Sequence, residues 1–207
     1  MIGLKQNDVS LQALDALREV GNIGMGNAAT SLAQLMNVRI DMSVPRAALL
    51  SFDDIVEMSG GMEEVVSCVY MKVLGDAPGT VLYIFDEKST YHLLDTMLET
   101  SGATEQMMTP LAESAIKEIG NVLTGSFISA IASLTGLRMI TTVPLFSFDM
   151  LGAVLSSSLI ESGYTEKEVL IIDTAFFQGR QQINGHFFLF ADPGSLETML
   201  YSLGISA

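Results

Sequence analysis

Residues 19–45 read EVGNIGMGNAATSLAQLMNVRIDMSVP, and residues 118–144 read EIGNVLTGSFISAIASLTGLRMITTVP, so one stretch occurs twice along the chain. The two copies align without a gap at a shift of 99 residues, and nine of the 27 positions are identical. Seven of the other 18 positions exchange one apolar residue for another. Such self-similarity indicates an internal duplication.

The similarity continues more weakly towards the end of each copy. Two further pairs of segments resemble one another, residues 79–86 with 185–192 and residues 94–98 with 196–200. We therefore expect residues 1–207 to form a single domain of two repeats, at about residues 8–100 and 109–203. The boundary is expected within Thr100–Thr109, where Ser101 and Gly102 suit a short exposed linker.

Each repeat is expected to begin with a long helix. Thr109, followed by a proline, is typical of an N-cap and first helical position, and Asp8 or Ser10 could cap the first helix. Asn37 and Gly136 occupy equivalent positions after the two helices. Both residue types tolerate the left-handed conformation that closes a helix, so the helices are predicted to end there.

Strands and turns follow each long helix. Runs rich in apolar, β-branched and aromatic residues predict strands at Val38–Val44, Val65–Leu74, Gly79–Phe85, Leu137–Val143, Val169–Phe177 and Gly185–Phe190. Phe52–Gly61 is interpreted as a polar connection. The predicted fold class is α+β, with the two repeats related by a pseudo-two-fold axis. Their strands form an antiparallel sheet, accompanied by two long helices and shorter closing helices.

The composition is that of an acidic, folded chain. Of the 207 residues, 49% are apolar and 16% are charged, which is ample material for a core. A net charge of −14 argues against binding to nucleic acid, whose phosphates need cationic partners, and against an anionic membrane surface. The single cysteine, Cys68, and a start without signal-peptide features suit the cytoplasm. No membrane insertion is predicted, because the most apolar long stretch, residues 128–146, is interrupted by Arg138 and Pro144.

The two long helices carry the same polar pattern. Its positions are i, i+4 and i+7, which lie within an arc of about 60° on one helix face. The residues are Asp15, Glu19 and Asn22 in the first repeat, and Ser114, Glu118 and Asn121 in the second. A proline, Pro45 or Pro144, follows each asparagine by 23 positions.

The pattern admits a structural explanation as well as a functional one. A single copy suits an ordinary solvated helix face, but two copies at identical spacing favour a functional role. Five glycines also crowd these helices, at a cost of about 1 kcal/mol each relative to alanine: Gly21, Gly24, Gly26, Gly120 and Gly125. They suit either the close approach of another protein's backbone or a close crossing of the two helices.

A glutamate and an asparagine together suit a phosphoryl-transfer reaction. An asparagine amide cannot act as a general base, but it can hold a water in line for attack. Phosphoryl transfer depends mostly on positioning and charge stabilisation. The sequence has no metal-ligand cluster, nucleophilic cysteine motif or phosphate-binding loop of its own. His92 and His186 have no neighbours at ligand spacing, so no metal is expected.

This duplicated pattern resembles the CheC/CheX/FliY family of chemotaxis phosphatases, and within it the CheC branch. The resemblance covers nearly the whole chain. It implies a hydrolase that removes the phosphoryl group from phosphorylated CheY, with the aspartyl phosphate and its Mg²⁺ on CheY and no cofactor on this chain. Asn22 and Asn121 are then expected to position the water, and Glu19 and Glu118 to contact CheY.

The same resemblance implies supporting roles for Asp15, Ser114, Pro45 and Pro144, and makes CheD a further expected partner. The alternative is a non-catalytic adaptor that binds CheD or flagellar switch components. Intact Glu/Asn pairs in both repeats favour the enzyme.

Overall fold

The centre of the molecule is one antiparallel sheet. A computed structural model describes residues 11–98, 108–162, 168–178 and 181–205. Within these ranges seven strands pair in the order β1-β6-β7-β3-β2-β4, and β5 also pairs with β2. The strands are β1 (Asp41–Ser51), β2 (Val65–Gly75), β3 (Gly79–Asp86), β4 (Met139–Thr141), β5 (Leu145–Met150), β6 (Glu168–Gln178) and β7 (Gln181–Ala191).

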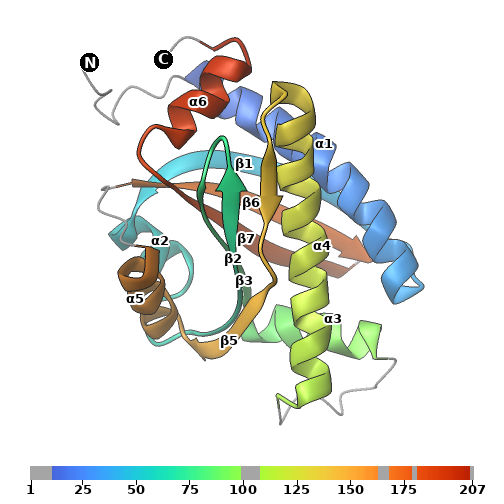
Figure 1. Cartoon of the computed structure of the whole chain (residues 1–207). Helices are drawn as coiled ribbons and strands as arrows, with labels where there is room; N and C mark the ends of the chain where they lie inside the picture. The colour runs from blue at the N-terminus through green and yellow to red at the C-terminus, as the bar shows by residue number, and fades with distance from the viewer. Residues whose placement is uncertain (1–10, 99–107, 163–167, 179–180, 206–207) are drawn as a thin grey trace.

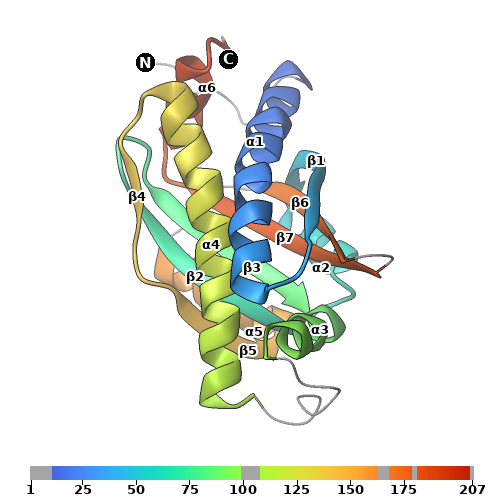
Figure 2. The same cartoon turned by 90° about the vertical axis from the view of Figure 1, so that its right-hand side faces the viewer.

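Helices cover both faces of this sheet. The described residues form α1 (Leu11–Met36), α2 (Phe52–Met58), α3 (Glu87–Met97), α4 (Pro110–Thr135), α5 (Leu151–Ser162) and α6 (Ser195–Ser202). The long helices α1 and α4 lie side by side across one face, and α2 and α5 cover part of the opposite face (Figures 1 and 2). This arrangement confirms the predicted α+β fold.

The two halves of the chain exchange their outer strands. β1 of the first half pairs with β6 of the second, and β4 and β5 of the second half pair with β2 of the first. β3 and β7 join the halves at the centre of the sheet. The strand order therefore reads the same from either edge when the halves are interchanged, as a pseudo-two-fold axis between β3 and β7 requires.

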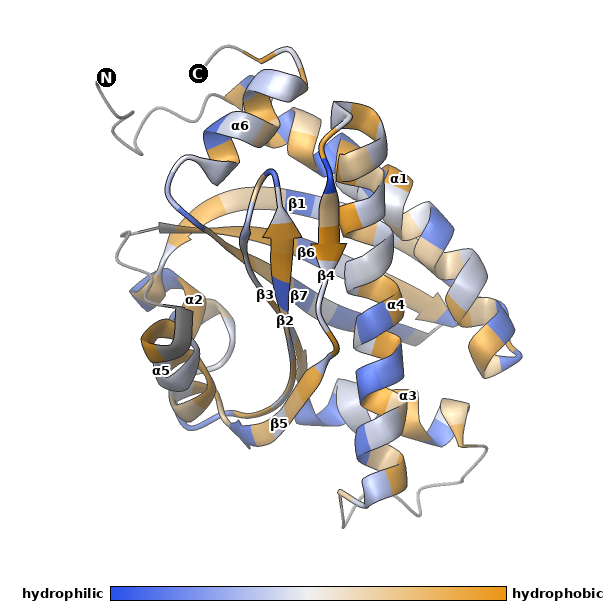
Figure 3. Ribbon diagram, in the orientation of Figure 1, coloured by the Kyte–Doolittle hydropathy of each residue, from blue (hydrophilic) through white to orange (hydrophobic). Residues whose placement is uncertain are grey.

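The core lies in two layers, one on each side of the sheet. The layer beneath the long helices contains Leu17, Phe127 and Phe187, all fully buried, and the rings of Phe127 and Phe187 lie 4.4 Å apart between centroids. The smaller layer beneath α2 and α5 contains Ile55 and Phe188. Figure 3 shows the hydrophobic strands between these layers and hydrophilic positions on the first half of α4.

The helix ends follow the predicted signals wherever the structure describes them. The hydroxyl of Thr109 accepts a hydrogen bond from the amide of Ala112 at 3.2 Å and caps α4. Asn37 and Gly136 both have left-handed backbones, with φ values of 52° and 73°. The expected caps Asp8 and Ser10 lie outside the described residues, as does most of the expected boundary at residues 100–109.

Three of the predicted strands agree with the structure to within one residue at each end, namely β2, β3 and β6. The strand predicted at Val38–Val44 is misplaced. β1 begins at Asp41 and continues through Pro45 to Ser51, because an edge strand tolerates a proline at a bulge. The strand predicted at Leu137–Val143 is shorter in the structure, where β4 spans Met139–Thr141. After Pro144, β5 continues the same edge of the sheet.

The interpretation of Phe52–Gly61 as a polar connection was wrong. The segment contains α2, which begins with a capping box: Ser51 and Asp54 each bond the other's backbone amide at 3.2 Å. Ile55 anchors the helix and is fully buried. The capping signature was present in the sequence, but one apolar anchor made too weak a periodic pattern to reveal the helix.

Candidate functional site

The predicted site residues lie on two separate helix faces. On α1, Asp15 and Glu19 are exposed and Asn22 is half-buried. The equivalent residues of α4 repeat this pattern, with Ser114 and Glu118 exposed and Asn121 half-buried. Since α1 packs beside β1 and α4 beside β2 and β4, the two faces lie towards opposite edges of the sheet (Figure 2). The structure brings together each triplet, but not the two triplets with one another.

The aspartate and the two glutamates on these faces differ in their ion pairing. Asp15 forms an exposed ion pair with Arg18, with 3.2 Å between Oδ1 and Nη2. Within the described part of the chain, neither Glu19 nor Glu118 forms an ion pair. Both carboxylates therefore face solvent and can meet a cationic group of another protein.

Asn22 is fixed by the backbone of β1. Its side-chain oxygen accepts a hydrogen bond from the amide of Val44 at 3.0 Å. Because the donor is a backbone N–H, the oxygen of the Asn22 amide must face Val44. The NH₂ group points away from this contact, and the oxygen keeps one free lone pair.

The irregularity around Pro45 makes the amide of Val44 available. The pairing of β1 with β6 runs from Ser43 directly to Arg46 and skips Val44 and Pro45. Val44 is only 4% exposed, so its N–H needs a partner within the protein. Asn22 supplies that partner. The proline of the repeated motif thus lies at the bulge that turns a backbone donor towards the asparagine.

In the described part of the chain, the second copy keeps the interruption but lacks the hydrogen bond. β4 ends at Thr141 and β5 begins at Leu145, so the edge strand breaks around Pro144. Thr142 bridges the break, since its hydroxyl accepts a bond from the amide of Lys72 at 3.0 Å. Among the described residues, the side chain of Asn121 has no hydrogen-bond partner, and Val143 is 79% exposed.

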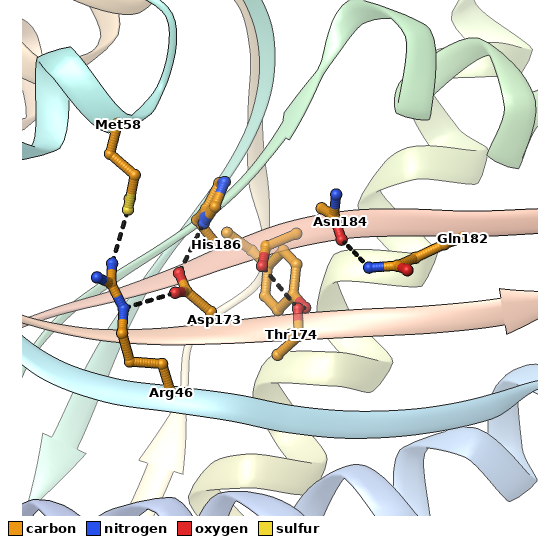
Figure 4. A network of polar contacts seen from close by, with 9 residues as sticks. Arg46, Met58, Asp173, Thr174, Gln182, Asn184 and His186 are labelled. Carbon is orange, nitrogen blue, oxygen red and sulfur yellow. Dashed lines mark hydrogen bonds and ion pairs between the residues drawn. The ribbon is translucent and has the colours of Figure 1, made fainter.

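Sequence reasoning missed a charged row next to the first copy. Arg46 Nε lies 2.8 Å from Asp173 Oδ2, and Asp173 Oδ1 lies 2.9 Å from His186 Nδ1 (Figure 4). The three residues stand opposite one another on β1, β6 and β7. No motif connects them, because only the register of the sheet brings residues so far apart in sequence into contact.

The row holds Asp173 in its ionised form. Burial of this carboxyl opposes ionisation, but the hydrogen bond and charge of His186 and the adjacent Arg46 outweigh it, and the pKa of Asp173 falls below its ordinary value. Arg46 also donates to the sulfur of Met58 at the end of α2, at 2.8 Å. Arg46 is thus held from two directions.

Internal packing accounts for three of the five helix glycines. A Cβ at Gly24 would lie 3.0 Å from the Cα of Phe127, which marks a close crossing of α1 and α4. Gly21 and Gly120 are equivalent and pack on the sheet instead, against Val44 and Val69.

The other two glycines adjoin the site. Gly26 and Gly125 follow Asn22 and Asn121 by one helical turn, and within the described part of the chain a Cβ at either position would meet no atom within 4 Å beyond its own helix backbone. The protein's own packing does not explain them. Open space therefore borders each asparagine.

Among the described residues, no group of three or more His, Cys, Asp and Glu side chains is placed to hold a metal ion. No helix in this part of the chain combines the length and apolarity needed to cross a bilayer.

Comparison with solved structures supports the fold. The crystal structure of Thermotoga maritima FliY matches with a TM-score of 0.79 at 20% identity, over 95% of this chain and 98% of that chain. The FliM middle domain of H. pylori matches with a TM-score of 0.69 at 11% identity, over 94% and 99% of the two chains. At these identities the likeness shows a shared fold.

Comparison of sequences identifies the family. The model of the CheC-like family matches residues 13–48 and 111–147, which contain both copies of the Glu/Asn pattern. The chain is also 36% identical over 209 residues to the CheY-P phosphatase CheC of Bacillus subtilis (strain 168). That alignment covers 97% of this chain and 98% of the relative. With such identity over nearly its whole length, the chain belongs to the CheC-like family.

Proposed function

We propose that this chain is a cytoplasmic phosphatase that hydrolyses the aspartyl phosphate of the response regulator CheY. The observation that carries the proposal is the pairing of exposed Glu19 with half-buried Asn22 on one face of α1, repeated as Glu118 and Asn121 on α4. The B. subtilis relative is named a CheY-P phosphatase, and this supports the same reaction class here.

In this proposal the asparagines orient the attacking water. An amide offers two donors and one acceptor group in a fixed plane, which suits a water that must lie in line with the phosphorus. Alignment and charge stabilisation supply most of the catalysis in phosphoryl transfer. The bond from Val44 leaves the amide protons of Asn22, and one lone pair of its oxygen, free for that task.

The glutamates fix the docking position. Glu19 and Glu118 lie one turn before the asparagines, expose their carboxylates, and suit an ion pair with a basic residue of CheY. The open space at Gly26 and Gly125 lets the backbone of CheY approach the helix closely. Docking and water positioning thus use adjacent turns of one helix face.

The remaining chemistry belongs to CheY. CheY carries the phosphorylated aspartate and is expected to hold the Mg²⁺, so this chain needs no cofactor of its own. Pro45 and Pro144 support the site by interrupting the edge strands beside the asparagines. Asp15 and Ser114 occupy the exposed turn before each glutamate and extend the docking face.

The decisive measurement is the decay of phosphorylated CheY with and without this protein. We expect the wild-type chain to accelerate the decay, and Asn22→Ala and Asn121→Ala each to remove part of that acceleration. The double variant should remove nearly all of it. Full activity of the double variant would reject the water-positioning role.

A matched control is available on the same helix. Asn27 is exposed on α1 but lies about 140° around the helix from Asn22, on another face. Asn27→Ala removes the same chemical group and should leave the decay rate unchanged. A loss equal to that of Asn22→Ala would indicate a general effect of the helix surface instead.

CheD binding is the second candidate, in line with the family resemblance. The double variant separates the two functions, since a protein that no longer accelerates CheY-P decay can still be tested for CheD in a pull-down. We expect CheD to be retained by this variant. Wild-type protein that retains CheD but never accelerates the decay would favour the adaptor.

A further inference from the structure

The charged row beside the first site has an apolar counterpart beside the second. Arg46 pairs with Asp173 between β1 and β6, as Leu145 pairs with Tyr70 between β5 and β2. The 99-residue shift makes Arg46 equivalent to Leu145, so the register makes Asp173 equivalent to Tyr70. In the same rows, Leu82 on β3 lies opposite Tyr70, as His186 on β7 lies opposite Asp173.

Among the described residues, the side chains of the second row form no polar contact. Leu145 is 55% exposed, and within the described part of the chain the buried hydroxyl of Tyr70 has no hydrogen-bond partner. The first row, in contrast, joins three strands by two contacts of 2.8 and 2.9 Å. The same sheet position is therefore held by ionic contacts in one repeat and not in the other.

The repeat that has the ionic row is also the repeat whose asparagine, Asn22, accepts a backbone hydrogen bond. Arg46 is the first residue after the bulge to regain its pairing with β6, two positions after the Val44 amide that bonds Asn22. Because its ion pair with Asp173 holds Arg46 so close to the bulge, Arg46 acts as an anchor that limits how far Val44 can move. In the second repeat the anchor and the asparagine hydrogen bond are both missing among the described residues.

We propose that Arg46, Asp173 and His186 are positioning residues that hold the bulge of β1 and thereby orient Asn22. The inference rests on the proposed phosphatase function and makes its two sites unequal. The first site carries its asparagine in a fixed orientation before CheY docks. The second site orients Asn121 only in the complex.

The chemistry of the row explains how it holds the bulge. Asp173 accepts from Arg46 with one oxygen and from His186 with the other, and these two contacts hold the carboxylate in one orientation (Figure 4). Met58 contacts another nitrogen of the guanidinium. The ion pair is charge-assisted, which makes it stronger than a neutral hydrogen bond.

The activity test uses variants with a single working site. In an Asn121→Ala background only the first site acts, and Arg46→Ala should lower kcat on the order of tenfold with little change in KM, because a slightly misplaced amide loses alignment rather than binding. In an Asn22→Ala background the same substitution should leave kcat unchanged. Equal losses in both backgrounds, or none in the first, would overturn the proposal.

Two further variants distinguish positioning from charge. Arg39 lies just before β1 and forms an exposed ion pair with Asp41, so Arg39→Ala removes the same charge without touching the row. It should preserve kcat in the Asn121→Ala background. Arg46→Lys keeps the charge beside Asp173 and should restore part of the lost kcat. A defect in Arg39→Ala equal to that of Arg46→Ala would mean that net charge, and not the anchor, sets the rate.

A second measurement does not depend on activity. Hydrogen exchange of the Val44 amide, followed by NMR, reports its bond to Asn22 directly. In Arg46→Ala this amide should exchange at least about tenfold faster, whereas the amide of Lys72 beside the second site should not change. An unchanged rate of hydrogen exchange at the Val44 amide would refute the role of Arg46 as an anchor. A wild-type chain without phosphatase activity would reject only the proposed function, and the exchange result would still decide the positioning role.

Discussion

Gly120 on α4 lies directly against Val69 on β2, and a Cβ atom at position 120 would stand 2.6 Å from the Cβ of that valine. The helix reaches the sheet this closely only because glycine has no side chain. Gly120→Ala should therefore overpack the core and lower the free energy of unfolding by about 1–3 kcal/mol. Urea denaturation monitored by circular dichroism measures this loss.

Substitution of Gly125, one turn beyond Asn121, should have the opposite effect on the free energy of unfolding. Among the described residues a Cβ at position 125 would meet no atom within 4 Å beyond its own helix backbone, so Gly125→Ala gains helix propensity without a clash. We expect its free energy of unfolding to rise by up to about 1 kcal/mol. A destabilised Gly125→Ala variant would show that glycine is needed there for the protein's own fold.

The two asparagines should differ in their effect on stability. Asn22→Ala leaves the buried amide of Val44 without an acceptor and should cost about 1–3 kcal/mol in the free energy of unfolding. Asn121→Ala breaks no hydrogen bond within the described residues and should remain within about 0.5 kcal/mol of the wild type. Equal losses in urea titrations of the two variants would contradict this difference.

Asp173 should make stability depend on acidity. Its pKa is lower in the folded chain than the ordinary value of 3.8, so its ionised form stabilises the fold above that pH, and the stabilisation is lost as the pH falls through the folded pKa. At about pH 5, Asp173→Asn should be less stable than the wild type, and the difference should shrink below pH 3.8. A difference that stays constant on acidification would disprove this role.

Cys68 should be chemically silent in the folded protein. Burial raises the pKa of its thiol to about 12, so the reactive thiolate is scarce at neutral pH, and the side chain is only 2% exposed. A thiol reagent such as Ellman's reagent should label the native chain far more slowly than the chain in urea. Rapid stoichiometric labelling of the native protein would contradict its burial.

The repeat made much of the fold predictable. The aligned copies located α1 and α4, and the αL closures at Asn37 and Gly136 follow from residue type alone. The helices α2 and α5 were not predicted, because each lies between strands and shows only a short apolar pattern. The exchange of outer strands could not be predicted from the sequence either, because self-similarity does not determine which repeat a strand pairs with.

The candidate site was predictable only in part. Helical periodicity alone groups Glu19 with Asn22 on one face, and the structure leaves that face open to solvent. The partner of Asn22 was not predictable, because Val44 is an ordinary strand residue whose freed amide results from a bulge. Asp173 lies 127 residues from Arg46, and only the sheet register relates the two.

The exchange of strands between the repeats has a consequence for how such a molecule could arise. A protein made of one repeat would leave β1 without a partner strand and one edge of β2 unpaired, and a second copy of the same chain could supply both contacts. Fusion of the two copies makes their association intramolecular and independent of protein concentration. Once fused, the copies were free to diverge, so that one edge could acquire an ionic anchor while the other did not.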